Sequence, residues 1–277
     1  MTMIRAQDGT QLLLHSYPQE GARATVAVLH GYGEHGGRYQ HVMEAWQAHG
    51  IQSFAIDVRG HGRSEGRRGY VGRFPEYHQD LRALLEVVES KRNDKPFFVF
   101  GHSHGALIAL HGMLTAGIGK GAKGLLLSSP FLGVALPVNP IKRGLGVLMS
   151  GIWPTLALPA GIKGTDVTRD PEQARLYEAD PLNNKNATAR WFTEAMGAIA
   201  EVQTRAGELS LPTILLYGGA DKTASANETD RLAASLKMSD RVVERIAGGP
   251  HELVNDLPDA KAQVIERYGK WMAERAG

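Results

Sequence analysis

Phe97-Phe98-Val99-Phe100-Gly101-His102-Ser103-His104-Gly105 is the stretch that decides the fold of this 277-residue chain. Four strand-forming apolar residues run into a Gly-x-Ser-x-Gly turn, and an apolar helical pattern follows over residues 106–110. A sharp turn of this kind needs both glycines, because a Cβ at either flank would collide with the neighbouring strand or helix. The stretch therefore predicts a nucleophilic serine, Ser103, on a strained backbone between a buried strand and a helix.

Outward from this turn, short apolar strands alternate with helical patterns, which predicts a mostly parallel central sheet with helices on both faces. The expected strands are 11–15, 25–29, 52–56, 97–100, 123–128, 213–217 and 241–246. Apolar residues recur at helical spacing within 75–91 and again in the final helix, so both helices should bury one face. Together with the serine turn, this order of elements predicts an α/β-hydrolase fold.

The alternation stops at Pro130, which predicts an insertion in the chain. We expect a hydrolase core of residues 1–130 and 206–277 and a helical cap of residues 131–205 that lies over Ser103 and forms an apolar pocket. Within the cap, Asp170-Pro171 predicts a helix start, and a second helix is expected over about 188–205. Residues 144–162 carry no charge, but two prolines and four glycines make them poor helix interior, so we expect a lid or interfacial segment there.

A second Gly-x-Ser-x-Gly spans residues 62–66 and places Ser64 at its centre. No strand enters this match and no helix leaves it, because charged and glycine-rich segments flank it on both sides. It is therefore interpreted as a surface loop, and Ser103 is the favoured nucleophile.

A serine hydroxyl needs a base, which in turn needs an orienting carboxylate. In this fold the acid and then the histidine follow the serine along the chain. Ten of the eleven histidines lie at or before His111, which leaves His251 as the base. Asp221 alone among the intervening aspartates ends a buried strand, so it is the predicted acid. The alternatives are that Asp221 caps the next helix and that His251 is an ordinary loop residue.

Two backbone N–H groups should stabilise the developing oxyanion. One belongs to His104, directly after the nucleophile, and we assign the other to Tyr32 in the loop His30-Gly31-Tyr32-Gly33-Glu34. A plain glycine turn is the alternative for this loop. His102 and His104 form a His-x-His pair, but no carboxylate or third ligand is spaced with them, so no metal and no cofactor is expected.

The composition narrows the function classes further. Lys and Arg number 31 against 29 Asp and Glu, a balance that gives no reason to expect nucleic-acid binding. The absence of cysteine excludes disulfides, thiolate catalysis and cysteine-ligated metals. Residues 1–9 lack the apolar core of a signal peptide, which favours a cytoplasmic location.

The chain resembles the monoacylglycerol lipase and lysophospholipase-like family of α/β-hydrolases, also described as serine aminopeptidase-type hydrolases. The matching stretches run in the family's order along almost the whole chain: residues 30–39, 57–66, 101–105, 129–130, 180–182, 219–222 and 251–253. The resemblance implies hydrolysis of a single fatty-acyl ester of glycerol through an acyl-enzyme. It carries Ser103, Asp221 and His251 onto the family's catalytic residues.

The resemblance also implies roles outside these three residues. It carries Tyr32 and His104 onto the oxyanion donors and places Glu34 and Arg38 near the glycerol hydroxyls, where a carboxylate accepts and a guanidinium donates. A local Glu34–Arg38 ion pair that holds the loop is the alternative. His104 stands where many relatives have Met or Gln. Tyr32 is bulkier than the small residue that some relatives have at the same position.

The expected partner is a small lipid ester, with transient contact between the cap and a membrane surface. The oligomeric state is left open. The rival functions are a lysophospholipase, a short-chain carboxylesterase or a peptidase of the same fold, and a non-catalytic binding module. A binding module is disfavoured because the chain keeps the serine, the acid, the histidine and both glycines.

Overall fold

The computed structural model describes residues 2–135 and 140–277. Its main sheet has eight strands in the order β1-β2-β4-β3-β5-β6-β9-β10. The strands are β1 (Thr2–Arg5), β2 (Gln11–Tyr17), β3 (Ala24–Leu29), β4 (Ile51–Ile56), β5 (Phe97–His102), β6 (Gly124–Ser128), β9 (Thr213–Gly218) and β10 (Arg241–Ile246). From β4 to β10 in this order every pairing is parallel, whereas β1 pairs with β2 and β2 pairs with β4 in antiparallel fashion. The predicted α/β-hydrolase fold class is confirmed, with all seven expected strands present.

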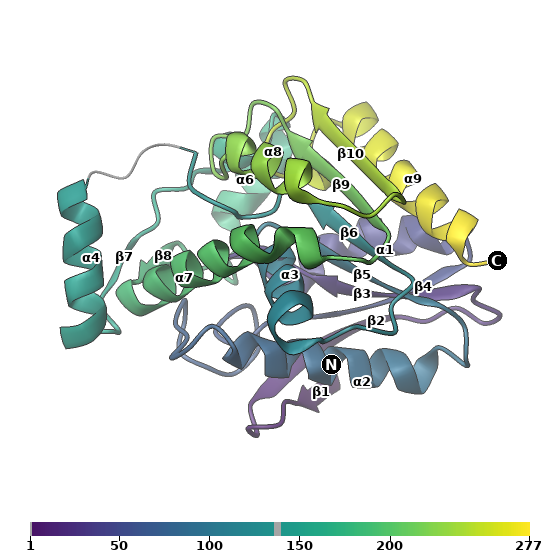
Figure 1. The fold of residues 1–277 in the computed structure, drawn as a ribbon, viewed down its shortest axis with the longest axis horizontal. Coiled ribbons are helices and arrows are strands. Elements are labelled where there is room, and N and C mark those ends of the chain that lie inside the picture. The colour runs from purple at the N-terminus through teal and green to yellow at the C-terminus, as the bar shows by residue number, and fades with distance from the viewer. Residues whose placement is uncertain (1, 136–139) are drawn as a thin grey trace.

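Helices cover both faces of the sheet and complete two apolar cores (Figure 1). They are α1 (Gln40–Gln47), α2 (Glu76–Lys91), α3 (His104–Ala116), α8 (Ala226–Ser235) and α9 (Pro258–Arg275), with short 3-10 turns η1 (Gly36–Tyr39), η2 (Ala206–Glu208) and η3 (Leu253–Asn255). One core lies under α2, α3 and α8, and the other lies under α1 and α9. The stripe of apolar residues predicted for the final helix is buried in the second core.

A separate group of elements lies between β6 and β9. It consists of α4 (Pro140–Ile152), β7 (Ala157–Pro159), α5 (Gly164–Val167), α6 (Pro171–Ala179), β8 (Asn186–Thr188) and α7 (Ala189–Arg205). β7 and β8 pair only with each other. In Figure 1, α7 runs from the core toward α4, which lies at the far edge of the molecule. Residues 136–139, part of the predicted cap, lie outside the described residues.

Asp170 and Thr188 begin the two helices predicted in this segment. Asp170 accepts hydrogen bonds from the backbone N–H groups of residues 172 and 173, and Thr188 accepts one from Trp191.

The expectation that residues 144–162 make poor helix was wrong for the first half of this segment, because α4 continues to Ile152. Packing against α7 offsets the cost of the helical glycines, and Ser150 Oγ contacts Thr193 Oγ1 at 2.7 Å.

Within the described residues, no helix combines the length and the apolar character that a membrane crossing demands.

Three short strands were not expected from the sequence. β1 is a four-residue edge strand whose side chains are mostly exposed, so it carries no pattern of alternating burial. β7 and β8 have three residues each. Strands this short are specified by their partner rather than by their own periodicity.

Candidate active site

The structure brings Ser103, His251 and Asp221 together at the carboxyl ends of β5, β10 and β9. His251 Nε2 lies 2.9 Å from Ser103 Oγ, and His251 Nδ1 lies 2.6 Å from Asp221 Oδ2. Ser103 and His251 are 5% and 4% exposed, so the contacts are shielded from bulk water. An imidazole between a hydroxyl and a carboxylate can take the hydroxyl proton and is stabilised when it becomes charged.

Ser103 occupies the turn between β5 and α3 with a left-handed backbone, φ 51°. Few residues other than glycine adopt this conformation, and it persists only where the surroundings enforce it. A Cβ at Gly105 would lie 2.3 Å from the carbonyl oxygen of Leu29, and one at Gly101 would lie 2.6 Å from the backbone of Ala106. The collisions expected from the sequence are therefore present, and they explain both glycines.

The charge of His251 is set by its buried surroundings. Burial lowers the pKa of this imidazole, but the negative charge of Asp221 and its hydrogen bond outweigh burial, so the pKa is raised above its usual value. The buried carboxylates of Glu252 and Glu34 act in the same direction. The neighbouring imidazole of His102 behaves oppositely, because burial and the proximity of His251 lower its pKa to about 3.

The structure also decides two alternatives left by the sequence. Asp221 does not cap the next helix, because Ser225 is the N-cap of α8. Asp221 Oδ1 instead accepts from the backbone N–H groups of Thr223 and Ala224 and leaves Oδ2 for His251. Ser64, the second candidate serine, is buried in a loop, where its hydroxyl donates to the carbonyl of Asp57 and accepts from the N–H of Leu13.

The two residues predicted as oxyanion donors are neighbours. Tyr32 follows β3 and His104 begins α3, and their rings lie 5.9 Å apart between centroids. Gly105 allows this approach, since its position faces the backbone at the end of β3. The structure thus brings the Tyr32 loop and the start of α3 into contact.

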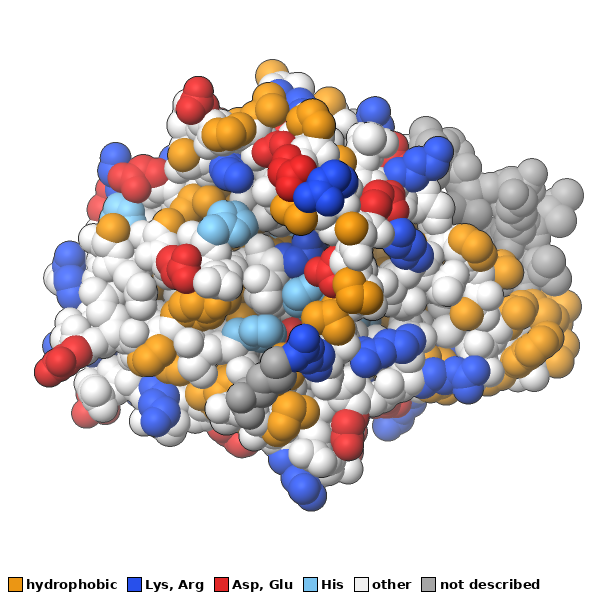
Figure 2. All heavy atoms as spheres, turned by 180° about the vertical axis from the view of Figure 1, so that it is seen from behind, with side chains coloured by type: hydrophobic (Ala, Val, Ile, Leu, Met, Phe, Trp, Pro, Cys, Tyr) orange, Lys and Arg blue, Asp and Glu red, His pale blue; other side chains and the backbone are white. Residues whose placement is uncertain are grey.

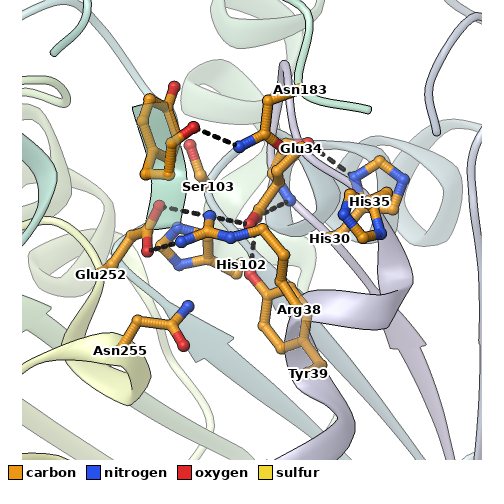
Figure 3. Close-up of polar contacts among 12 residues, drawn as sticks. His30, Glu34, His35, Arg38, Tyr39, His102, Ser103, Asn183, Glu252 and Asn255 are labelled. Carbon is orange, nitrogen blue, oxygen red and sulfur yellow. Dashed lines mark hydrogen bonds and ion pairs between the residues drawn. The ribbon is translucent and has the colours of Figure 1, made fainter. Parts of the chain in front are cut away.

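Glu34 and Arg38, predicted to bind the substrate's hydroxyls, lie in a buried network beside Ser103 (Figure 3). Glu34 Oε1 accepts from the N–H of Gly31 at 2.6 Å and from the hydroxyl of Tyr39 at 2.7 Å, and Oε2 accepts from Arg38 at 2.6 Å. Arg38 also donates two bonds of 2.7 Å to Glu252. Burial raises the pKa of Glu34, but Arg38 and His30 outweigh it, so the pKa lies below its usual value and the carboxylate stays charged.

The sequence reasoning missed three participants in this region. Glu252 directly follows His251, but its partner Arg38 is 214 positions away. Asp180 ends α6 and contacts His35 Nε2 at 2.9 Å, which ties the segment between β6 and β9 to the Tyr32 loop. Trp191 of α7 packs on Tyr32. Each residue lies in or next to a stretch singled out in the sequence, yet no local pattern pairs it with its distant partner.

Residues 20–258 match the family described as serine aminopeptidase, S33. The chain is 28% identical to the monoglyceride lipase of Mus musculus, over 97% of this chain and 88% of that protein. It is 30% identical to an uncharacterised abhydrolase domain-containing protein of Dictyostelium discoideum, over 91% of this chain but only 26% of that longer protein.

Among solved structures, a monoacylglycerol lipase of Paleococcus ferrophilus is similar with a TM-score of 0.84 and 25% identity, covering 96% of this chain and 99% of that one. The family match spans most of the chain and includes Ser103, Asp221 and His251. The sequence, the fold and the arrangement of these side chains agree: the chain belongs to the serine aminopeptidase S33 family of α/β-hydrolases.

Proposed function

We propose that this protein is a serine hydrolase that cleaves the carboxylic ester of monoacylglycerols to glycerol and a free fatty acid. The observation that carries the proposal is the position of His251, in contact with both Ser103 Oγ and Asp221. The similarity to monoglyceride lipases over almost the whole chain supports the substrate class.

In the proposed mechanism, Ser103 Oγ attacks the ester carbonyl while His251 Nε2 takes its proton. The backbone N–H groups of Tyr32 and His104 stabilise the oxyanion, an effect of roughly 3–4 kcal/mol for each donor. His251 then protonates the departing glycerol oxygen. A water molecule repeats the attack on the acyl-enzyme and releases the fatty acid, and the proton returns to Ser103.

For Glu34 and Arg38 the contacts support a positioning role more than direct contact with glycerol. Both oxygens of Glu34 are engaged within the protein, and one holds the N–H of Gly31 next to Tyr32. Arg38 joins this loop to Glu252, the neighbour of the proposed base. The network therefore couples the two loops that carry the oxyanion donor and the base.

We further propose residues 131–205 as the cap, with its outer end as the part that contacts a membrane surface. Large apolar side chains are exposed there on α4, the turn after it and β7: Val147, Leu148, Ile152, Trp153 and Leu158. Figure 2 shows hydrophobic side chains gathered at this end of the molecule. Exposed apolar groups of this size are typical of surfaces that meet lipid or another protein.

Replacement of Ser103 by Ala tests the proposed chemistry. The wild-type protein should be labelled covalently by a fluorophosphonate, and Ser103→Ala should lose all labelling because it removes the hydroxyl that contacts His251. Ser64→Ala is the matched control and should be labelled like the wild type. Undiminished labelling of Ser103→Ala would contradict the proposal.

A comparison of hydrolysis rates tests the substrate. Monoacylglycerols should be cleaved faster than p-nitrophenyl butyrate, diacylglycerols and lysophosphatidylcholine. A higher rate on short simple esters would instead indicate a carboxylesterase, and one on lysophosphatidylcholine would indicate a lysophospholipase.

A further inference from the structure

We infer that Trp191 of the cap is a positioning residue for the oxyanion hole, because this single indole ring contacts both residues proposed as oxyanion donors. The inference rests on the proposed function, since it concerns the charge that forms when Ser103 attacks. It assigns to the proposed cap a part in the chemical step.

The contacts of Trp191 reach three residues next to the reaction centre. Its ring packs on Tyr32 with 3.7 Å between centroids, and its indole N–H donates to His104 Nε2 at 3.3 Å. It also stacks with Phe131, with 6.1 Å between ring centroids and 17° between ring planes. The backbone N–H of Phe131 in turn donates to the carbonyl of Ser103 at 3.0 Å.

The indole N–H fixes the state of the His104 ring. His104 is fully buried, and burial together with His61 and His30 holds its pKa well below the usual value, so the ring is neutral. Its Nδ1 is buried with no hydrogen-bond partner within the described residues. Because indole can only donate, Nε2 must be the bare nitrogen that accepts. Loss of this bond would leave both ring nitrogens of the residue after the nucleophile without a partner.

The cap is docked on the core immediately beside Trp191. Thr188 accepts from the N–H of Trp191 at 3.3 Å and donates to the carbonyl of Gly69 at 2.7 Å. The hydroxyl of Tyr32 donates to the carbonyl of Asn186 at 2.7 Å. These bonds fix the start of α7, and with it Trp191, against the Tyr32 loop, and only 5% of Trp191 is exposed.

This arrangement makes the alignment of the donors depend on a docked cap. Oxyanion donors act only when they lie at hydrogen-bond distance from the charge that develops, and a displacement of about 1 Å costs on the order of 100-fold in rate. If the cap moved away from the core, the rings of Tyr32 and His104 would lose their contacts with Trp191. The hole would then be complete only when the cap is closed over the substrate.

The test uses Trp191→Phe, which keeps a ring but loses the N–H, and Trp191→Ala. Phe192→Ala is the control, since this neighbour on α7 is a partly buried aromatic residue that packs against the same core. The substrate is p-nitrophenyl acetate, whose short acyl chain does not fill an acyl pocket. We expect kcat to fall about 10-fold for Trp191→Phe and about 100-fold for Trp191→Ala, with KM changed less than about threefold.

A second measurement separates positioning from packing. A trifluoromethyl ketone forms an alkoxide on Ser103 that occupies the oxyanion hole, so its inhibition constant should rise in proportion to the loss of kcat. A rise in KM alone, or a loss of kcat with unchanged affinity for the ketone, would overturn the inference. If Trp191→Ala does not fold, Trp191→Phe alone decides between these outcomes. Failure of the proposed function is recognised separately, because Ser103→Ala would then still hydrolyse the ester.

Discussion

At the scale of single residues, Asp221 directs one carboxylate oxygen to the backbone of its own loop and the other to His251. Oδ1 accepts from the N–H groups of Thr223 and Ala224 at 2.7 and 2.9 Å, and Oδ2 faces His251. The backbone bonds therefore fix which oxygen meets the imidazole. In an Asp221→Asn variant, the same two backbone N–H groups would determine the orientation of the side-chain amide.

Replacement of Asp221 by Asn should lower kcat roughly 1,000- to 10,000-fold. The amide oxygen must take the place of Oδ1 to satisfy the two backbone donors, which turns the NH₂ group toward His251. Nδ1 would then accept, Nε2 would carry the proton, and the base could no longer accept from Ser103. The measurement is kcat on a p-nitrophenyl ester, with circular dichroism as the control for folding. An Asn variant of near wild-type kcat would exclude Asp221 as the orienting acid.

Replacement of Glu252 by Gln should shift the acidic limb of the kcat/KM profile to lower pH. Glu252 is buried and its negative charge raises the pKa of His251, so its removal lowers that pKa. The base must be neutral to accept a proton, and a lower pKa extends activity toward acid. Asp256→Asn is the control, since Asp256 is also buried nearby but pairs with Arg169. An identical shift in both variants, or none in Glu252→Gln, would contradict this role.

At the scale of elements, the junction of β5 and α3 decides where Ser103 and its neighbours lie. The start of α3 packs so closely on the end of β3 that position 105 has room only for glycine. The same approach puts His104 beside Tyr32. Because the contact is between backbones, no side-chain rotation can relieve it.

Replacement of Gly105 by Ala should lower the free energy of unfolding by about 3 kcal/mol, or prevent folding, because α3 must move away from the carbonyls of Leu29 and His30. Gly197→Ala is the matched control: this helical glycine of α7 has open space around a Cβ, and alanine there should stabilise by up to about 1 kcal/mol. Urea denaturation followed by circular dichroism measures both. Equal stabilities of the two variants would refute the steric argument.

At the scale of the whole molecule, the segment between β6 and β9 contacts the core beside Ser103, through Trp191 with His104 and Phe131 with Ser103. The described part of this segment is anchored to the core near the site, through contacts such as Asp180 with His35 and Arg169 with Asp256. Its far end carries the exposed apolar side chains of α4 and β7. The exposed apolar end is the surface proposed above to contact a membrane.

The double replacement Ile152→Glu and Trp153→Glu should weaken binding to phosphatidylcholine vesicles at least about 10-fold, since it removes two side chains that are 70% and 58% exposed and adds two charges. Activity on a water-soluble ester should stay unchanged. Co-sedimentation with vesicles measures the binding, and Val243→Glu, an exposed apolar position on β10, is the control. Equal binding of wild type and double variant would remove the proposed membrane surface.

The amino-acid sequence by itself determined the fold class, seven strands, the helix start at Asp170, a second helix over about 188–205, and the serine, acid and histidine that the structure brings together. These features are local, or follow from the order of residues along one chain. Only the tertiary structure decided that Arg38 pairs with Glu252, that Trp191 reaches His104, and that α4 forms despite its glycines. The first two contacts join residues 214 and 87 positions apart, and the packing of α4 on α7 joins residues 43 positions apart. They depend on how loops end and helices pack rather than on any periodicity.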